Sequence, residues 1–66
     1  MKLHINGELR EISGTKNIPE LVAALGLEPS TVLVEHNGLA LHRSEWLTTN
    51  LAEGDRIEIL KVAAGG

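Results

Sequence analysis

Apolar and polar residues alternate at the start of the chain with the period of a half-buried β-strand. Residues 2–5 alternate in this way, and Asn6-Gly7 follows, a dipeptide that tolerates the positive φ angles of a tight hairpin turn. We therefore predict a hairpin whose return strand covers residues 8–12. Leu9 and Ile12 lie three positions apart, so a regular strand cannot turn both inwards. Either a bulge interrupts the strand or Leu9 is exposed, and the pattern leaves both open.

The next segment follows the period of a helix with one apolar side. Asn17 precedes it as an N-cap residue, and Glu20 stands three positions later, a variant of the capping box. Gly26 is a natural residue to end the helix, and Pro29 prevents the helix from resuming. The apolar positions recur at the spacing i, i+3, i+4 and i+7: Ile18, Leu21, Val22 and Leu25.

The second half of the chain predicts further strands. Residues 31–36 are apolar and β-branched, a second Asn-Gly turn follows, and residues 39–41 return. Residues 43–47 are less regular, and we expect a short helical turn that tucks Trp46 under the edge of the sheet. A turn then leads to the last strand at residues 56–61.

The last strand is apolar on both faces. Ile57 and Ile59 point to one face, whereas Leu60 and Val62 point to the other. Such a pattern is typical of a strand in the middle of a sheet. A small domain with one helix has nothing to cover the second face. Leu60 and Val62 therefore either form an exposed apolar patch of the kind that binds partners or pack locally under a loop.

The order of the elements predicts an α+β fold, in which one helix packs on a mixed sheet of four to five strands. The simplest topology places the first and last strands side by side and parallel at the centre. This is the β-grasp, or ubiquitin-like, arrangement. We expect the domain to cover residues 1–61 and residues 62–66 to form a flexible tail that ends in Gly-Gly.

Composition narrows the range of functions. The chain has 66 residues, enough for one small domain, with no cysteine and a net charge of −3. The lack of cysteine excludes disulfides, Cys-ligated zinc and a thiol nucleophile. Scattered basic residues and a single aromatic residue argue against nucleic-acid binding, and no apolar run is long enough for a membrane span. We expect a cytoplasmic protein.

No group of residues in the sequence suits catalysis. The carboxylates are dispersed, no serine has an adjacent base, and there is no Gly-rich phosphate loop. The histidines lack the spacing of metal ligands and are expected at the surface: His4, His36 and His42. We therefore predict no catalytic residue, no metal site and no bound cofactor, and hence a substrate or carrier protein rather than an enzyme.

The last residues suit a C-terminus that itself reacts. Gly65 and Gly66 lack a Cβ atom and pass where branched residues would clash, and Ala64 before them is also slim. A carboxylate on such a tail is thin enough to enter the active site of another protein. It is also unhindered at the carbon that a nucleophile attacks after activation.

Several motifs, taken in order, resemble the ThiS family, the sulfur carrier proteins of thiamine biosynthesis. The resemblance spans the whole chain, and the combination of motifs is more specific than any one of them. Related carriers of molybdopterin synthesis share the fold and the ending but are usually longer and generally lack the Arg-x-x-Trp segment. The motifs are the Asn-Gly turn, the capped helix, Arg43-x-x-Trp46, Gly54-Asp55 before the last strand, and Gly65-Gly66.

This resemblance implies that partner proteins supply all of the catalysis. A ubiquitin-activating-type adenylyltransferase (ThiF-like) would use ATP and Mg²⁺ to convert the Gly66 carboxylate into an acyl-adenylate. A persulfide from a cysteine desulfurase system would displace AMP and leave a thiocarboxylate, whose sulfur passes to thiazole synthase (ThiG-like). Gly65 and Ala64 would give passage, and Leu60 and Val62 would be docking contacts.

Three other functions remain open at this point. The protein could carry sulfur for molybdopterin synthesis or another pathway, or it could be a ubiquitin-like modifier joined to a lysine of a target. It could also be a non-catalytic β-grasp binding module in which the two glycines are incidental. Deletion of Gly65-Gly66 would spare the binding module alone.

Overall fold

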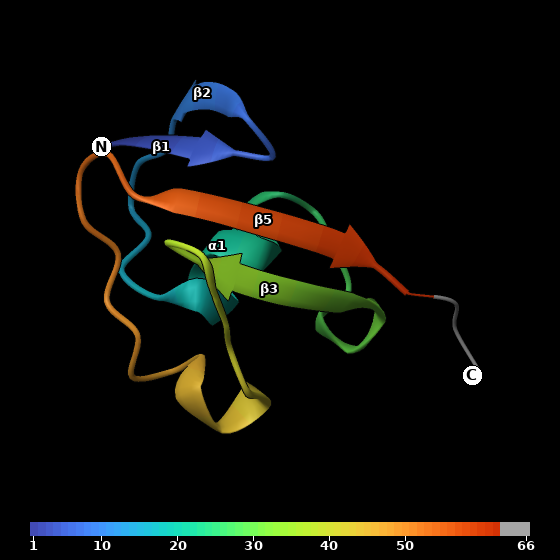
Figure 1. Cartoon of the computed structure of the whole chain (residues 1–66). Coiled ribbons are helices and arrows are strands. Elements are labelled where there is room, and N and C mark those ends of the chain that lie inside the picture. Colours follow the sequence, from blue (N-terminus) through green and yellow to red (C-terminus); the bar gives the residue numbers. More distant parts are fainter. Residues whose placement is uncertain (63–66) are drawn as a thin grey trace.

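The computed structural model describes residues 1–62, which form one α-helix, five strands and two short 3₁₀ turns (Figure 1). The helix is α1 (Ile18–Ala24), and the two turns are η1 (Pro29–Thr31) and η2 (Arg43–Glu45). The strands are β1 (Lys2–Ile5), β2 (Glu8–Glu11), β3 (Val32–His36), β4 (Leu39–Ala40) and β5 (Arg56–Lys61).

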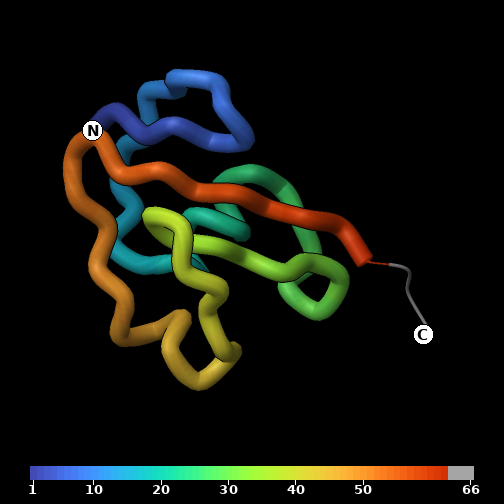
Figure 2. The backbone as a smooth tube through the Cα atoms, in the orientation of Figure 1, coloured from blue at the N-terminus to red at the C-terminus, as the bar shows by residue number. Residues whose placement is uncertain are grey.

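The five strands form one mixed sheet in the order β2-β1-β5-β3-β4. The first and last strands run parallel at its centre, and the other neighbours are antiparallel. Figure 2 shows the backbone of β5 running from beside the N-terminus through the middle of the molecule to its far end. With α1 on one face of the sheet, this arrangement confirms the predicted α+β fold of the β-grasp, or ubiquitin-like, class.

The helix begins and ends where the sequence predicts. The side chain of Asn17 accepts a hydrogen bond from the backbone N–H of Glu20 (3.0 Å), and the Glu20 carboxylate accepts one from the N–H of Lys16 (2.7 Å). The first bond satisfies an N–H that the first turn leaves without an intrahelical partner, and the second ties the residue before the N-cap to the same turn. At the other end Gly26 has a φ of +74°, which stops the helix after its cap residue Leu25.

The pairing of β1 with β2 settles which residue of the return strand faces inwards. The register is regular from Lys2 opposite Glu11 to Ile5 opposite Glu8, so no bulge interrupts it. Leu9 is consequently exposed, with 56% of its surface accessible, whereas Ile12, just beyond the strand, is buried. The core consists of aliphatic residues from the sheet and helix together with Trp46: Leu3, Ile5, Ile12, Ile18, Leu21, Val22, Val32, Val34, Trp46, Ile57 and Ile59.

Two details of the middle segment differ from the sequence-based expectation. Pro29 starts a 3₁₀ turn, and β3 begins at Val32, one residue later than predicted. The reason is that Thr31 bonds backwards: its N–H and its hydroxyl both donate to the carbonyl of Glu28, at 3.0 and 2.7 Å. Trp46 follows η2 and is buried, as predicted for this segment.

Candidate docking surface and tail attachment

The face of the sheet opposite α1 carries an exposed pair of leucines at its centre. Leu60 of β5 stands directly opposite Leu33 of β3, so their side chains lie on the same face, and each is 54% exposed. Val62 continues this row and is 40% exposed. Leu60 and Val62 therefore form an exposed patch and are not packed under a loop. Their role as docking contacts stays a prediction.

Two glutamates face each other beside the leucine pair. Glu35 of β3 stands opposite Glu58 of β5, on the same face as Leu33 and Leu60. Like charges placed directly opposite on a sheet repel and lower stability. We call this row of Leu33, Glu35, Glu58, Leu60 and Val62 the open-face patch. It combines an apolar centre with two carboxylates, which suits a partner surface that offers an aliphatic and a basic side chain.

Just beyond the end of β5, Val62 is hydrogen-bonded to η1. The N–H of Val62 donates to the carbonyl of Thr31 (2.8 Å), which extends the β3–β5 ladder by one pair beyond the end of β5. The site residues predicted further along, Ala64, Gly65 and Gly66, lie outside the described residues.

Arg43 holds the segment that receives this bond. Its guanidinium donates to the carbonyl of Pro29, the first residue of η1, and to the carbonyl of Val32 (3.0 Å), the residue that follows η1. The same group lies over the ring of Trp46, 4.3 Å from its centroid, in a cation–π contact. The Arg-x-x-Trp motif is thus a clamp that ties η2 to the start of β3 and so to the place where Val62 is bound.

A polar cluster holds the opposite end of β5. The Asp55 carboxylate lies 2.7 Å from His36 Nε2 and accepts hydrogen bonds from the Asn37 side chain (3.2 Å) and the N–H of Ala52 (3.0 Å). Burial opposes ionisation of Asp55, but these three hydrogen bonds outweigh it and hold the pKa of Asp55 below its ordinary value of 3.8. The sequence predicts His36 at the surface, but only 19% of its side chain is accessible, and it contacts Asp55.

The described part of the chain contains no recognisable metal site. In residues 1–62 there is no group of three or more His, Cys, Asp or Glu side chains arranged to hold an ion. Within the same range, no helix has the length and apolar character needed to cross a membrane. The described residues therefore define the class of protein: a small ubiquitin-like domain with an exposed patch on one face of β3 and β5.

Comparison with known proteins narrows this class to a family. The model of the ThiS family matches residues 3–66, so the chain belongs to this family of ubiquitin-like sulfur carriers. A crystal structure of the thiamine biosynthesis protein (ThiS) from Geobacter metallireducens has a TM-score of 0.84 at 35% identity, and the match covers 100% of both chains. An NMR solution structure of a thiamine biosynthesis protein from the same organism has a TM-score of 0.81 at 35% identity and covers 100% of this chain and 88% of the other.

Two curated relatives are much longer proteins. Both are named thiazole synthase, one from Paramagnetospirillum magneticum and one from Magnetococcus marinus, and they are 35% and 33% identical to this chain over all 66 residues. The chain spans 20% of the length of each.

Proposed function

We propose that this protein is a sulfur carrier of thiamine biosynthesis and that its C-terminal carboxylate is the reacting group. The observation that carries the proposal is the match of the ThiS family over residues 3–66, which takes in Gly65 and Gly66. The 0.84 TM-score to a thiamine biosynthesis protein supports it. In this proposal the protein is a substrate of enzymes rather than an enzyme.

Activation at Gly66 requires a better leaving group than a carboxylate oxygen. The partner adenylyltransferase, with ATP and Mg²⁺, joins the carboxylate oxygen to the α-phosphorus of ATP and releases pyrophosphate. A persulfide from a cysteine desulfurase system then attacks the acyl carbon, and AMP leaves. A second thiol cleaves the S–S bond of the resulting acyl disulfide, so that one sulfur stays on Gly66 as a thiocarboxylate. Because activation consumes ATP, the proposed location is the cytoplasm.

Thiazole synthase is the proposed acceptor of this sulfur. The two relatives named thiazole synthase each contain a stretch similar to this whole chain within one fifth of their length. A domain of this kind therefore occurs in one polypeptide with a thiazole synthase. In this proposal the chain delivers its sulfur to an enzyme of the same kind.

The open-face patch is the proposed docking surface for the adenylyltransferase. It adjoins Val62, so a partner bound there is next to the residue from which the tail continues. An aliphatic contact on Leu33 and Leu60 excludes water, and a basic side chain between Glu35 and Glu58 relieves the repulsion of the two carboxylates.

A kinetic comparison of four proteins tests this proposal. With the cognate adenylyltransferase and ATP, Gly66→Val is expected to fold normally but to lower kcat/KM at least about tenfold, because a branched side chain obstructs the reacting carbon. Leu60→Glu is expected to raise KM and leave kcat nearly unchanged, because it removes a docking contact. Leu9→Glu is the control, since Leu9 lies outside the open-face patch, on the edge strand β2, and is 56% exposed, against 54% for Leu60.

Two results would contradict the proposal. If Gly66→Val is adenylated as fast as the wild type, the C-terminal carboxylate is not attacked in a confined site. If Leu9→Glu and Leu60→Glu raise KM equally, the effect comes from net charge and the open-face patch is not the docking surface.

A further inference from the structure

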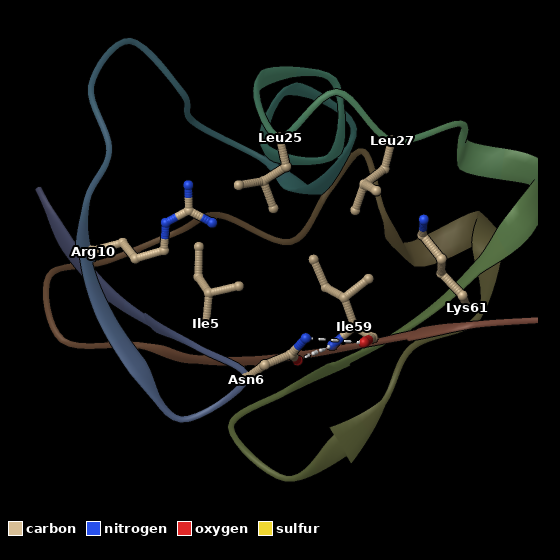
Figure 3. Close-up of a pocket in the computed structure, with 7 residues that line it drawn as sticks. All are labelled: Ile5, Asn6, Arg10, Leu25, Leu27, Ile59 and Lys61. Atoms are coloured by element: carbon tan, nitrogen blue, oxygen red, sulfur yellow. Dashed lines mark hydrogen bonds between the residues drawn. The ribbon is translucent and has the colours of Figure 1, made fainter.

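A groove lies on the other side of the sheet, between the end of α1 and the strands β1 and β5 (Figure 3). Its volume is about 320 Å³. Ile5 and Ile59 rise from the sheet toward Leu25 and Leu27 on the helix side, so the floor and wall are aliphatic. The groove adjoins solvent because Leu25 and Leu27 are only partly buried and the residues at its rim are exposed.

Both charged residues that line the groove are basic. Arg10 stands opposite Leu3 in the β1–β2 pair, which turns its side chain to the helix side of the sheet. Lys61 ends β5 and lies at the opposite end of the row of lining residues (Figure 3). Among the described residues neither side chain forms a salt bridge. A chain of net charge −3 thus presents two cations around an aliphatic groove.

The edge of β5 is open beside the same groove. On its β1 side, β5 bonds to β1 up to Ile57, and the side chain of Asn6 then takes the place of the next strand residue: it accepts from the N–H of Ile59 (2.7 Å) and donates to its carbonyl (3.2 Å; Figure 3). Alternate residues of a strand direct their N–H and C=O to alternate sides. Since Val62 bonds to η1 on the β3 side, the N–H and C=O of Lys61 point to the side where β1 has ended.

We propose that this groove binds an extended segment of a partner protein that carries an aliphatic residue between two acidic ones. The segment pairs with the free backbone edge at Lys61, places its aliphatic side chain between Leu27 and Ile59, and directs its carboxylates to Arg10 and Lys61. This proposal goes beyond the proposed function, because it stands on the geometry and charge of the groove alone.

The size of the groove and the strand edge favour a peptide over a metabolite. Pockets for whole small molecules have volumes of about 300–1,000 Å³ and enclose most of the ligand, so an open groove at the lower limit suits one or two side chains. Addition of a strand to an open sheet edge supplies backbone hydrogen bonds, and a pocket for alternate side chains supplies specificity. Successive residues on one face of a strand lie about 7 Å apart, which sets the spacing acid–x–aliphatic–x–acid.

The test uses a synthetic peptide of this pattern, acetyl-Glu-Thr-Leu-Thr-Glu-amide, added to ¹⁵N-labelled protein and followed by NMR. The expected result is saturable shifts of the Leu25, Leu27 and Lys61 amides, with little change at Leu33 and Leu60. The variants Arg10→Glu and Lys61→Glu are expected to weaken binding at least about fivefold each, because they repel the peptide carboxylates. Lys16→Glu changes the net charge equally at an exposed residue outside the groove lining and is expected to bind as the wild type does.

Three control ligands test separately the charge of the segment, its backbone pairing and its being a peptide. A peptide with Lys in place of both Glu, and one N-methylated at the leucine amide, are expected to bind at least about fivefold more weakly. The proposal is wrong if the acidic peptide causes no saturable shifts, if the shifts map to Leu33 and Leu60, or if Lys16→Glu weakens binding as much as Lys61→Glu. Equal binding of hexanoate, an aliphatic carboxylate without a backbone, would assign the groove to a small molecule instead. None of these readouts depends on sulfur transfer.

Discussion

The two sides of the sheet differ in charge and in the support behind their apolar residues. On the open face, Leu33 and Leu60 stand beside Glu35 and Glu58, and the leucines contribute little to the core. On the helix side, the groove is lined by Ile59, which belongs to the core, and by basic residues. Strand β5 contributes to both because its side chains alternate. One strand therefore offers two surfaces of opposite charge beside the point where Val62 leaves the sheet.

This difference would allow a small protein to bind more than one partner. A partner that complements two carboxylates does not complement an arginine and a lysine, so the two surfaces select different proteins. Both surfaces include the end of β5, which brings either partner close to the start of the C-terminal tail. We expect the protein to tolerate substitutions on the open face without unfolding. Substitutions in the floor of the groove are expected to destabilise it.

The largest expected effect comes from truncating neighbouring residues on the two sides. Ile59→Ala removes a core side chain and is expected to lower the free energy of unfolding by about 2–4 kcal/mol. Leu60→Ala is expected to change it by less than about 0.5 kcal/mol, because Leu60 is exposed. Urea unfolding followed by the fluorescence of Trp46, the single tryptophan, measures both. Equal losses would show that the open face is covered in solution.

An intermediate effect is expected at the start of β5, away from both surfaces. Asp55→Asn removes the charged acceptor of the bond from His36 and is expected to cost about 1–3 kcal/mol at neutral pH. The pKa of Asp55 is lower in the folded state than in the unfolded state, so the carboxylate takes up a proton more readily when the protein is unfolded. The stabilisation is therefore complete above the ordinary pKa of 3.8 and disappears as pH falls through the folded pKa.

Unfolding of the wild type and of Asp55→Asn across acidic pH checks this sign. The free-energy difference between the two proteins should shrink as the solution is acidified below the ordinary pKa of Asp55. A constant difference would mean that Asp55 acts through packing and not through its charge.

The smallest expected effect has the opposite sign. Glu35→Gln removes the repulsion across the β3–β5 pair and is expected to stabilise the fold by about 0.2–0.5 kcal/mol. Glu8→Gln on the exposed strand β2 is the control and is expected to leave stability unchanged. Thermal unfolding at low ionic strength resolves the difference. Destabilisation by Glu35→Gln would show that the carboxylate makes a favourable contact and is not held against repulsion.

The elements of the fold could be predicted because their signals are local. The Asn-Gly turns, the capped helix and the alternation in β5 each lie within a few residues. The exposure of Leu33 was not predicted, although the sequence contains the signal for it. Residues 32–34 are all apolar, and because successive side chains of a strand alternate between faces, Leu33 must point away from the core, as Leu60 does.

The register of distant strands could not be predicted in the same way. The apposition of Glu35 with Glu58 depends on the register of β3 against β5, and the contact of His36 with Asp55 depends on the same register. The groove requires both that β1 ends at Ile5, just before Asn6, and that α1 lies above it. Short motifs in a single sequence carry no information on such distances.

The mass of the intact protein, purified from its own host, shows whether Gly66 carries sulfur. A sulfur carrier is expected to include a fraction of molecules heavier by the difference between sulfur and oxygen, with the change located at Gly66 by fragmentation. That fraction should disappear when the cognate adenylyltransferase is removed. A protein that carries only an unmodified carboxylate at Gly66, while thiazole is being made, would contradict the account.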